Sequence, residues 1–535
     1  MPTLKLNGDQ ALAYGAIAAG VKIVTGYPGS PSSATLEFIA EYAAAGNICV
    51  EWSANEKVAA EIAIGASIAG GRSLVCVKSV GMNAMVDPLM ALNLTPLNGG
   101  MVILLGDDPG GYGSQNDQDT RPLVLMLEMI MMEPASPKEA CEMMKEAFVI
   151  SEKKGIPVII RETRSFTVQE EEFEIADLPD ARKNNEYVRE TLRFVPVPKN
   201  VVEKHKSLHK RLDNLLGWSD NSPYNKMFLK SSKKGIVGSG FAFTKLIDVA
   251  GENNRGDISL LKLGVLHPLP ERLIVKFLNS VEEVIIFEEN EPFIEMQIKA
   301  IAQENNCKVK IHGKKNRCVP REGELFRWQI LEAIEKIYPE FIPAEKFIRE
   351  DEKNEIPGKQ SFCGGCRYDE VLDLIEETAG SLNQKIMITG DPGCLVSVAE
   401  RLDAKYSMGS AVAVADGMSK AGISARTVAL IGDSGFFHTT IPAICNAAHN
   451  EGNMLMIVLD NEGALASGRQ THPGINKNVR GEAASQLSIE KISRACGVNY
   501  IETVSLNDSR EKLKSVFKEL FLQNNLAMLI LKIPV

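Results

Sequence analysis

The sequence predicts an α/β protein of three doubly wound domains. Its 535 residues are enough for about three or four domains of ordinary size, and its 44% hydrophobic and 24% charged content is that of a globular protein. Short apolar runs repeatedly end in Gly-, Pro- or Asp-containing turns and are followed by helix-compatible stretches. That alternation is typical of βαβ units built on parallel sheets.

The first predicted domain is residues 1–180. An Ala-rich helix over 9–19 is closed by Gly20, and a short strand over 21–24 enters the turn TGYPGSPSS at 25–33. The segment EWSANE at 51–56 opens a second helix over 57–69. Buried strands are predicted over 74–78, 101–105 and 156–160.

A polar connector is predicted over 181–233, with one helix over 201–216 whose charged stretch 203–206 is expected to face solvent. Residues 234–345 predict a second α/β domain with strands at 235–237, 258–262, 284–287 and 309–311. Its Gly238-Ser239-Gly240 turn is a fragment of a dinucleotide fingerprint, so nucleotide binding is not expected there. The turns 266–270 and 288–291 are expected to contact a neighbouring domain rather than substrate. A linker over 346–360 precedes the last domain, 361–535.

Charge, hydropathy and cysteine use exclude several classes of protein. The net charge is −10 without a basic block, which argues against nucleic acid as a partner. No apolar run approaches the roughly 18 residues of a membrane span, and the N-terminus does not resemble a signal peptide. Ten scattered cysteines suit reduced thiols. We therefore expect a cytoplasmic protein that contacts neither membrane nor nucleic acid.

The most informative stretch is 427–461, which reads as strand, acidic turn, helix, strand and polar turn. In a parallel sheet both strands end at the same edge, so Asp433 and Asn461 should meet there. A carboxylate and an amide oxygen suit Mg²⁺, and the helix N-terminus between them suits a phosphate. The pattern, GDS followed by DN, is similar to the GDG and NN motif that binds thiamine diphosphate. The alternative is an ordinary turn with a capping Asp.

Glu56 is the second candidate. Thiamine diphosphate needs a carboxylic acid that is hydrogen-bonded to its pyrimidine ring and lies in a mostly apolar pocket. Glu56 opens an Ala- and Ile-rich helix and suits that role. The alternative is a Glu stabilised by the helix dipole.

The third candidate is the segment Cys363-Gly364-Gly365-Cys366. A CxxC pair suggests zinc, an Fe–S ligand pair or a redox dithiol. Because neither a second CxxC nor a spaced His pair follows, a glycine-rich loop that lines a cofactor is the favoured interpretation. The turn over 390–394, GDPGC, is predicted at the same sheet edge as the 427–461 unit.

Together these stretches resemble the 2-oxoacid:ferredoxin oxidoreductases, and among them the large (alpha) subunits of the indolepyruvate branch. The motifs that carry the resemblance are TGYPGSPSS, EWSANEKVAAE, FCGGC, GDPGC, YSMGSAVAVADG, GDSGFFHTTIPA, LDN and THPG, in this order. The resemblance implies two thiamine-diphosphate-binding folds that flank a transketolase C-terminal-like domain. The domain at 1–180 would bind the pyrimidine and the domain at 361–535 the diphosphate.

The resemblance also implies roles for individual residues. Asp433, Asn461 and the Gly463 carbonyl would hold Mg²⁺, and Glu56 would activate the cofactor. Ser30 would face the reaction centre, and His438 and His472 are candidates for proton transfer or substrate binding, or else structural histidines. The residues that would line the cofactor are Cys363, Gly364, Gly365, Cys366, Gly390, Asp391, Gly393, Cys394, Met408, Gly409, Gly432, Ser434 and Gly435.

The implied reaction is oxidative decarboxylation of a 2-oxoacid with transfer of the acyl group to coenzyme A. The sequence departs from the family because it has no CxxCxxCxxxCP run and hence no evident Fe–S site. Three alternatives follow: a partner subunit carries the electrons, the chemistry is non-oxidative, or the chain is a non-catalytic subunit. The segment after Asn461, NEGALASG, also differs, so aryl-pyruvate specificity is not assumed; Arg469 and Gln470 could bind a carboxylate. We expect a smaller subunit, an electron-carrier subunit, and a homodimer or hetero-oligomer.

Overall fold

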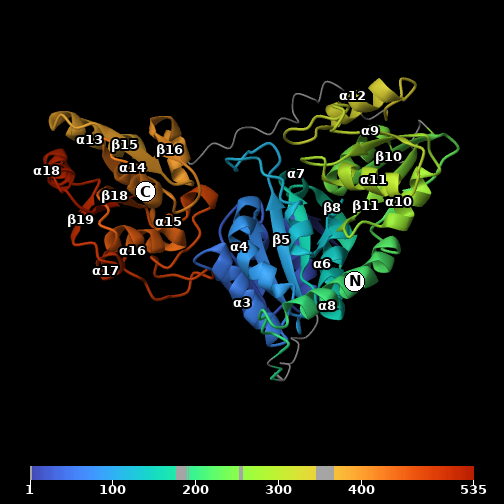
Figure 1. Ribbon diagram of the computed structural model, residues 1–535, viewed down its shortest axis with the longest axis horizontal. Helices are drawn as coiled ribbons and strands as arrows, with labels where there is room; N and C mark the ends of the chain where they lie inside the picture. Colours follow the sequence, from blue (N-terminus) through green and yellow to red (C-terminus); the bar gives the residue numbers. More distant parts are fainter. Residues whose placement is uncertain (1–2, 176–188, 191, 252–256, 345–366, 535) are drawn as a thin grey trace. The chain divides into compact units, whose positions relative to one another are not determined.

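The computed structural model describes residues 3–175, 189–190, 192–251, 257–344 and 367–534, and these form two compact units (Figure 1). The first unit holds most of the chain up to 344, and the second holds 367–534. The α/β class predicted from the sequence is confirmed, because each unit is built on mainly parallel sheets covered by helices. The domain boundaries remain predictions. Within the described residues, no helix is both long and apolar enough to span a bilayer.

The first sheet of unit 1 has seven strands in the order β12-β6-β7-β5-β4-β2-β3. Its strands are β2 (Ile23–Gly26), β3 (Cys49–Trp52), β4 (Ser73–Lys78), β5 (Met101–Asp107), β6 (Ile130–Met132), β7 (Val158–Thr163) and β12 (Val265–His267). Its helices are α1 (Gly8–Ala18), α2 (Ser33–Gly46), α3 (Glu56–Ile68), α4 (Ser79–Leu92), α5 (Leu123–Leu127), α6 (Pro137–Lys154) and α7 (Arg164–Thr167). β1 (Thr3–Asn7) and β8 (Glu170–Glu174) form a separate antiparallel pair. The strands β4, β5 and β7 are buried along their whole length or nearly so, as parallel strands between two helical layers must be.

The second sheet of unit 1 has five strands in the order β14-β13-β10-β11-β9. A connector helix, α8 (Val201–Asp220), leads into it. Its strands are β9 (Lys226–Phe228), β10 (Lys234–Ser239), β11 (Ser259–Leu263), β13 (Glu283–Phe287) and β14 (Lys310–His312), and its helices are α9 (Gly240–Ala250), α10 (Glu271–Leu278), α11 (Phe293–Glu304) and α12 (Arg327–Ile337). Side chains of α9 and α12 form one core with the strands, among them Leu246, Ile285 and Ile334.

The two sheets of unit 1 are joined by a strand and by buried ion pairs. β12 leaves the second domain to pair antiparallel with β6 of the first sheet. Arg121 Nη1 lies 2.8 Å from Glu288 Oε2, and both side chains are inaccessible to solvent. Arg161 is equally buried; it binds Asp107 at 2.6 Å and Glu133 at 2.5 Å within the first domain, and its Nη2 donates to Asn290 Oδ1 of the second domain at 3.5 Å. The turns 266–270 and 288–291 therefore contact the neighbouring domain, as expected.

Unit 2 is one six-stranded sheet in the order β16-β15-β17-β18-β20-β19. Its strands are β15 (Ile386–Gly390), β16 (Ala404–Lys405), β17 (Arg426–Gly432), β18 (Leu455–Asp460), β19 (Tyr500–Ser505) and β20 (Ala527–Lys532). Its helices are α13 (Tyr368–Ser381), α14 (Ala411–Lys420), α15 (Asp433–Gly435), α16 (Ile441–His449), α17 (Ile489–Ala495) and α18 (Arg510–Phe521), with the 3₁₀ segments η2 (Cys394–Arg401) and η4 (Leu465–Ser467).

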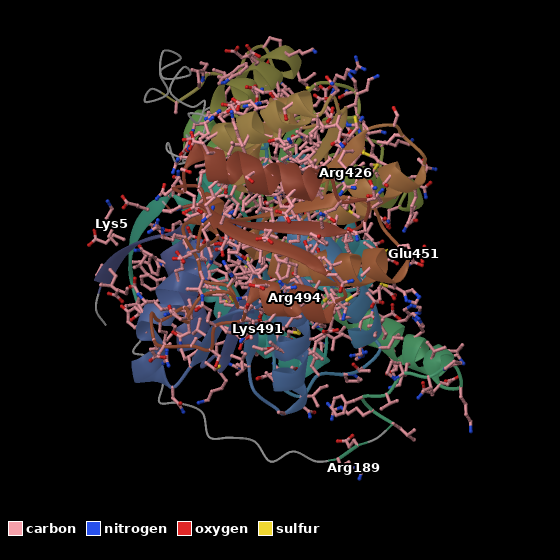
Figure 2. All side chains as sticks on the ribbon, turned by 90° about the vertical axis from the view of Figure 1, so that its left-hand side faces the viewer. Lys5, Arg189, Arg426, Glu451, Lys491 and Arg494 are labelled. Atoms are coloured by element: carbon pink, nitrogen blue, oxygen red, sulfur yellow. The ribbon has the colours of Figure 1, made fainter. Side chains whose placement is uncertain are left out.

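The sheet of unit 2 is covered on both faces, which makes it doubly wound. One core packs α13 and α18 against the strands, and the other packs α14, α16 and α17 against the opposite face. The outward side of α17 is polar: Lys491 and Arg494 are exposed, and Arg494 binds Glu490 at 3.0 Å (Figure 2). The two cores leave the carboxyl ends of β15, β17 and β18 as the polar edge of the sheet.

Candidate active site

Asp433 is the first residue after β17 and starts a helical segment over 433–449. From the sequence alone the helix-compatible stretch begins only at about Thr439, whereas in the structure a π turn, η3 (Phe436–Thr440), joins α15 to α16 and extends the helix back to Asp433. A π turn adds a residue and so interrupts the 3.6-residue periodicity by which a helix is recognised. The result is that Asp433 lies at the strand end and the helix N-terminus at once.

The Asp433 carboxylate is 2% exposed and is oriented from three sides. Oδ1 accepts from the N–H of Ser434 at 2.7 Å, and Oδ2 accepts from the N–H of Gly463 at 3.2 Å. His472 Nε2 lies 3.2 Å from Oδ2, and among the described residues this is the only ion pair of Asp433. Within the described chain, Asp433 is thus a buried carboxylate that neither Lys nor Arg neutralises.

Asn461 follows β18 and lies at the same edge, because β17 and β18 pair in parallel with Gly432 opposite Leu459. Its side chain is buried, and Nδ2 donates to the hydroxyl of Tyr368 at 2.8 Å. Its Oδ1 is buried and accepts from no donor within the described residues. A buried amide oxygen without a hydrogen-bond donor is unusual in a folded protein, and an amide oxygen that serves as a metal ligand has this environment.

These two side chains fit the expected Mg²⁺ site by donor chemistry. An uncompensated carboxylate and an open amide oxygen are hard oxygen donors. The Gly463 carbonyl, the third predicted ligand, already accepts from Leu465 N–H at 2.9 Å. A carbonyl has a second lone pair, so this bond leaves one available. The metal roles of Asp433, Asn461 and Gly463 stay predictions.

His472 is held between a ring and a backbone donor. It stacks on Phe437 with 5.5 Å between ring centroids, and its Nδ1 accepts from Gly474 N–H at 3.1 Å. Nε2 lies 3.2 Å from Asp433 Oδ2 but makes no hydrogen bond within the described residues. Proton transfer by His472 stays a prediction.

Asp391 anchors the turn after β15. Its two oxygens accept from the N–H groups of Gly409 and Ala411 at 2.8 and 2.9 Å, and a Cβ at Gly435 would lie 3.0 Å from Oδ2. Burial raises the pKa of Asp391 to about 7, although these N–H donors and the nearby His438 oppose the shift. Asp391 thus fixes the 409–411 turn against the helix that starts at Asp433.

The remaining predicted lining residues of unit 2 lie on this edge or beside it. The Met408 carbonyl accepts from Thr439 Oγ1 at 2.7 Å, and Gly409, with φ of 77°, has no room for a Cβ beside that oxygen. Gly390 ends β15, Gly393 (φ 98°) precedes Cys394 of η2, and Gly432 ends β17. Cys363, Gly364, Gly365 and Cys366 lie outside the described residues.

Glu56 is the first residue of α3 in unit 1 and is 8% exposed. Its carboxyl group packs against the first turn of α4, where a Cβ at Gly81 would lie 2.6 Å from Oε1. Any side chain at Gly81 would displace the acid. Ala59, Ala60 and Ala63 are the buried face of the same helix, so Glu56 sits at the end of an apolar surface.

Ser30 lies half-buried in the turn after β2. The N–H of Gly29 donates to Ser33 Oγ at 2.8 Å, and a Cβ at Gly29 would lie 2.9 Å from the Cβ of Lys78. The Ser30 turn and Glu56 therefore both border the segment 78–81 at the carboxyl end of β4. The structure brings these two predicted residues to one sheet edge.

Sequence reasoning missed polar residues at both edges. Tyr368, which holds Asn461, is 93 positions away in sequence and follows FCGGCR, a motif that drew attention to its cysteines alone. Lys78 Nζ donates to the Gly113 carbonyl at 2.6 Å and lies 3.8 Å from Asp108, and burial lowers the pKa of Lys78. The sequence feature that could have identified Lys78 as a site residue is its position at the carboxyl end of a predicted strand.

Two families match the chain. "Pyruvate flavodoxin/ferredoxin oxidoreductase, thiamine diP-bdg" matches residues 14–205, and "Thiamine pyrophosphate enzyme, C-terminal TPP binding domain" matches 386–531. A relative described as indolepyruvate oxidoreductase subunit IorA of Methanothermobacter thermautotrophicus is 33% identical over 99% of this chain and 86% of its own length.

The chain belongs to the 2-oxoacid:ferredoxin oxidoreductase family, as an alpha subunit. The proteins of the same description from Pyrococcus horikoshii and Archaeoglobus fulgidus are 32% and 31% identical over 96% and 99% of this chain, and 83% and 86% of their own lengths. The resemblance seen in the sequence is confirmed.

This oxidoreductase subunit is a thiamine-diphosphate-dependent enzyme that acts on 2-oxoacids. The match at 386–531 covers the edge with Asp433, Asn461 and Asp391, and the match at 14–205 covers the edge with Ser30 and Glu56. Both predicted halves of the cofactor site thus fall inside segments that match thiamine-diphosphate-binding families.

Of the carboxylate binders suggested beside Asn461, Gln470 is already engaged. It is 5% exposed, its Nε2 donates to the Ser467 carbonyl at 2.8 Å, and its Oε1 accepts from Ser467 Oγ at 2.7 Å. These bonds close the loop 463–470 on itself. Arg469 is exposed in that loop of the oxidoreductase and has a left-handed backbone conformation with φ of 64°.

Proposed function

We propose that this subunit oxidatively decarboxylates an aryl 2-oxoacid such as indolepyruvate, forms an acyl-CoA, and passes the electrons to a partner subunit. The observation that carries the proposal is the buried pair Asp433 and Asn461 at one sheet edge: within the described residues the carboxylate has no Lys or Arg partner and the amide oxygen accepts no hydrogen bond. The substrate class is supported by the names of the relatives, which are indolepyruvate oxidoreductase subunits.

In the proposed site, Asp433, Asn461 and the Gly463 carbonyl hold Mg²⁺, and the cofactor's diphosphate binds this ion and the helix N-terminus at 433. Thiamine diphosphate supplies an electron sink for the pair that remains on the substrate when CO₂ leaves. Tyr368 keeps Asn461 in its orientation, and the N–H groups of Ser434 and Gly463 do the same for Asp433. Gly409, Gly432 and Gly435 let the backbone approach the diphosphate.

Glu56 is proposed to hydrogen-bond the pyrimidine ring of the cofactor. Its position at the start of α3 against Gly81 fixes the direction of the carboxyl group. Ser30, His438 and the exposed Arg469 are proposed to contact the substrate, Arg469 through the substrate carboxylate.

The electron route is proposed to run through another protein. The 535 residues hold no CxxCxxCxxxCP run, and the relatives are themselves described as subunits. Cytoplasmic location, a smaller subunit and a higher oligomer stay predictions.

The experiment that tests this function uses the complex purified from its native source. We expect CO₂ release and acyl-CoA formation from indolepyruvate, and reduction of an added viologen, to depend on coenzyme A. Glu56→Gln should lower turnover at least about a hundredfold while thiamine diphosphate still binds. Glu61→Gln, on the exposed side of the same helix, is the matched control and should leave turnover unchanged.

Three outcomes would contradict the proposal. Aldehyde or acyloin release without an acceptor would indicate non-oxidative chemistry. Full turnover by the complex that contains Glu56→Gln would indicate a non-catalytic subunit. A preference for 2-oxoglutarate or pyruvate over indolepyruvate would overturn the substrate class alone.

A further inference from the structure

The connector helix α8 carries two histidines one turn apart, His205 and His209. Residues at i and i+4 lie on one side of a helix, so both imidazoles project from the same strip of its surface. Their ring centroids are 5.8 Å apart. Leu208, between them in sequence, is fully buried, so α8 is packed against other residues close to this strip.

Glu128 faces this pair from another part of unit 1. It follows α5 and has a left-handed backbone conformation with φ of 52°. Oε1 lies 2.9 Å from His209 Nε2, and Oε2 lies 3.8 Å from His205 Nδ1. Each carboxylate oxygen is thus directed at a different imidazole, and one ligand atom from each of the three residues lies within 4.8 Å of the others.

We propose that Glu128, His205 and His209 bind a divalent transition-metal ion, Zn²⁺ by preference, that ties α8 to the segment between α5 and β6. Two imidazoles at helical i, i+4 spacing and one carboxylate are a common three-ligand set for zinc. Bonds of about 2.0–2.2 Å in a tetrahedral site put ligand atoms about 3.4 Å apart, which small side-chain rotations would achieve here. Glu128 is 23% exposed and both histidines are more exposed, so water can complete the coordination.

Nearby cations do not oppose an ion at this place. On α8, Lys204 Nζ donates to the Arg193 carbonyl at 2.8 Å, and Lys206 pairs with Glu203 at 2.7 Å. Arg211 donates to the carbonyls of Gly155 and Asn93 at 2.6 and 3.0 Å. These interactions direct the three positive groups toward other partners.

The contact of Glu128 with His205 and His209 is one of several contacts that attach α8 to the rest of unit 1. The same helix is fixed by Arg211 on backbone carbonyls and by Ser219 Oγ, which donates to the Pro268 carbonyl at 2.7 Å. A metal ion would extend this attachment toward the N-terminal half of α8. The site is distinct from the cofactor residues, since it lies on the connector and on Glu128.

The test is a Co²⁺ titration of the untagged full-length chain, followed by its visible absorption. Excess Mg²⁺ and thiamine diphosphate keep the proposed Asp433 site occupied. We expect one Co²⁺ per chain with bands of nitrogen and oxygen ligation. His205→Ala and His209→Ala should each weaken binding at least about tenfold, and Glu128→Gln by a similar factor. Zn²⁺ should raise the melting temperature of the unsubstituted chain and not that of His205→Ala.

Two controls make the outcome decisive. His449→Ala removes an exposed histidine of unit 2 and should change nothing. Absence of a thiolate-to-Co²⁺ charge-transfer band separates this site from Cys363 and Cys366. The proposal is overturned if the chain binds no Co²⁺ at millimolar concentration, if the three variants bind as the parent does, or if the bound ion has thiolate ligation. In the first two cases Glu128 and the histidines form an ion pair and nothing more.

Discussion

Two sheet edges of this protein hold buried carboxylates at equivalent positions and use them differently. In unit 1, Asp107 at the end of β5 and Glu133 after β6 share the guanidinium of Arg161. In unit 2, Asp433 at the end of β17 meets backbone N–H groups and an imidazole, and Asn461 beside it keeps an open oxygen. The first edge has an internal cation and joins two domains, whereas among the described residues the second has neither a Lys nor an Arg partner.

The comparison teaches that a place at the carboxyl edge of a parallel sheet is not enough to make a binding site. Whether such an edge can bind a cation depends on whether the protein itself supplies a positively charged side chain there. A paired buried carboxylate contributes to structure, and removal of its partner leaves an uncompensated charge. An unpaired one can be retained where a ligand compensates it. The following predictions test this distinction, from the largest expected effect to the smallest.

Arg161→Met should destabilise unit 1 by about 3–5 kcal/mol, because it leaves Asp107 and Glu133 buried without a cation. Urea denaturation followed by tryptophan fluorescence measures this. Arg321→Met is the matched control, since Arg321 pairs with Glu291 on the surface near the same edge and its loss should leave the free energy of unfolding nearly unchanged. Equal effects of the two variants would break the comparison.

Asp433→Asn should weaken binding of thiamine diphosphate with Mg²⁺ at least about a hundredfold while the fold survives, because the charge that it removes is compensated by the ligand and not by the protein. Isothermal titration calorimetry measures the affinity. Asp508→Asn, at a partly exposed carboxylate paired with Lys512, serves as the control. If Asp433→Asn unfolds unit 2 with affinity otherwise intact, Asp433 is structural.

Tyr368→Phe should weaken Mg²⁺ affinity about tenfold, because Asn461 loses the hydroxyl that accepts from its Nδ2. The measurement is the Mg²⁺ concentration needed for half-maximal cofactor binding. Tyr500→Phe, on an exposed tyrosine of β19, should leave that concentration unchanged. An unchanged requirement in Tyr368→Phe would mean that Asn461 is oriented by its backbone alone.

Asp391 should make unit 2 less stable as the pH rises. Its pKa is about 7 in the folded protein, above the 3.8 of an unperturbed Asp side chain, so between these values the folded state binds more protons than the unfolded state. Stability should therefore fall from about pH 4 to pH 7, by up to about 1 kcal/mol per pH unit. Hydrogen exchange of β15 and β17 in the cofactor-free protein measures it, and Asp391→Asn should remove the slope. A slope that persists in that variant must come from another group.

Much of the site could be predicted from the sequence because it depends on short segments. A buried strand, a glycine-rich turn and a second strand place Asp433 and Asn461 at one edge, whatever covers the sheet. The same reasoning placed Glu56 at a helix start. The onset of the helix after Asp433 was missed, because the π turn over Phe436–Thr440 breaks the local period.

By itself, then, the sequence determined the α/β class, the cofactor family and the residues that end the strands, since each follows from local periodicity and turn chemistry. The tertiary structure alone decided which distant groups meet them. Tyr368 on Asn461, Gly81 against Glu56, and Glu128 between His205 and His209 are contacts across many residues. No periodicity encodes such contacts, because they arise when packed layers bring separate segments together.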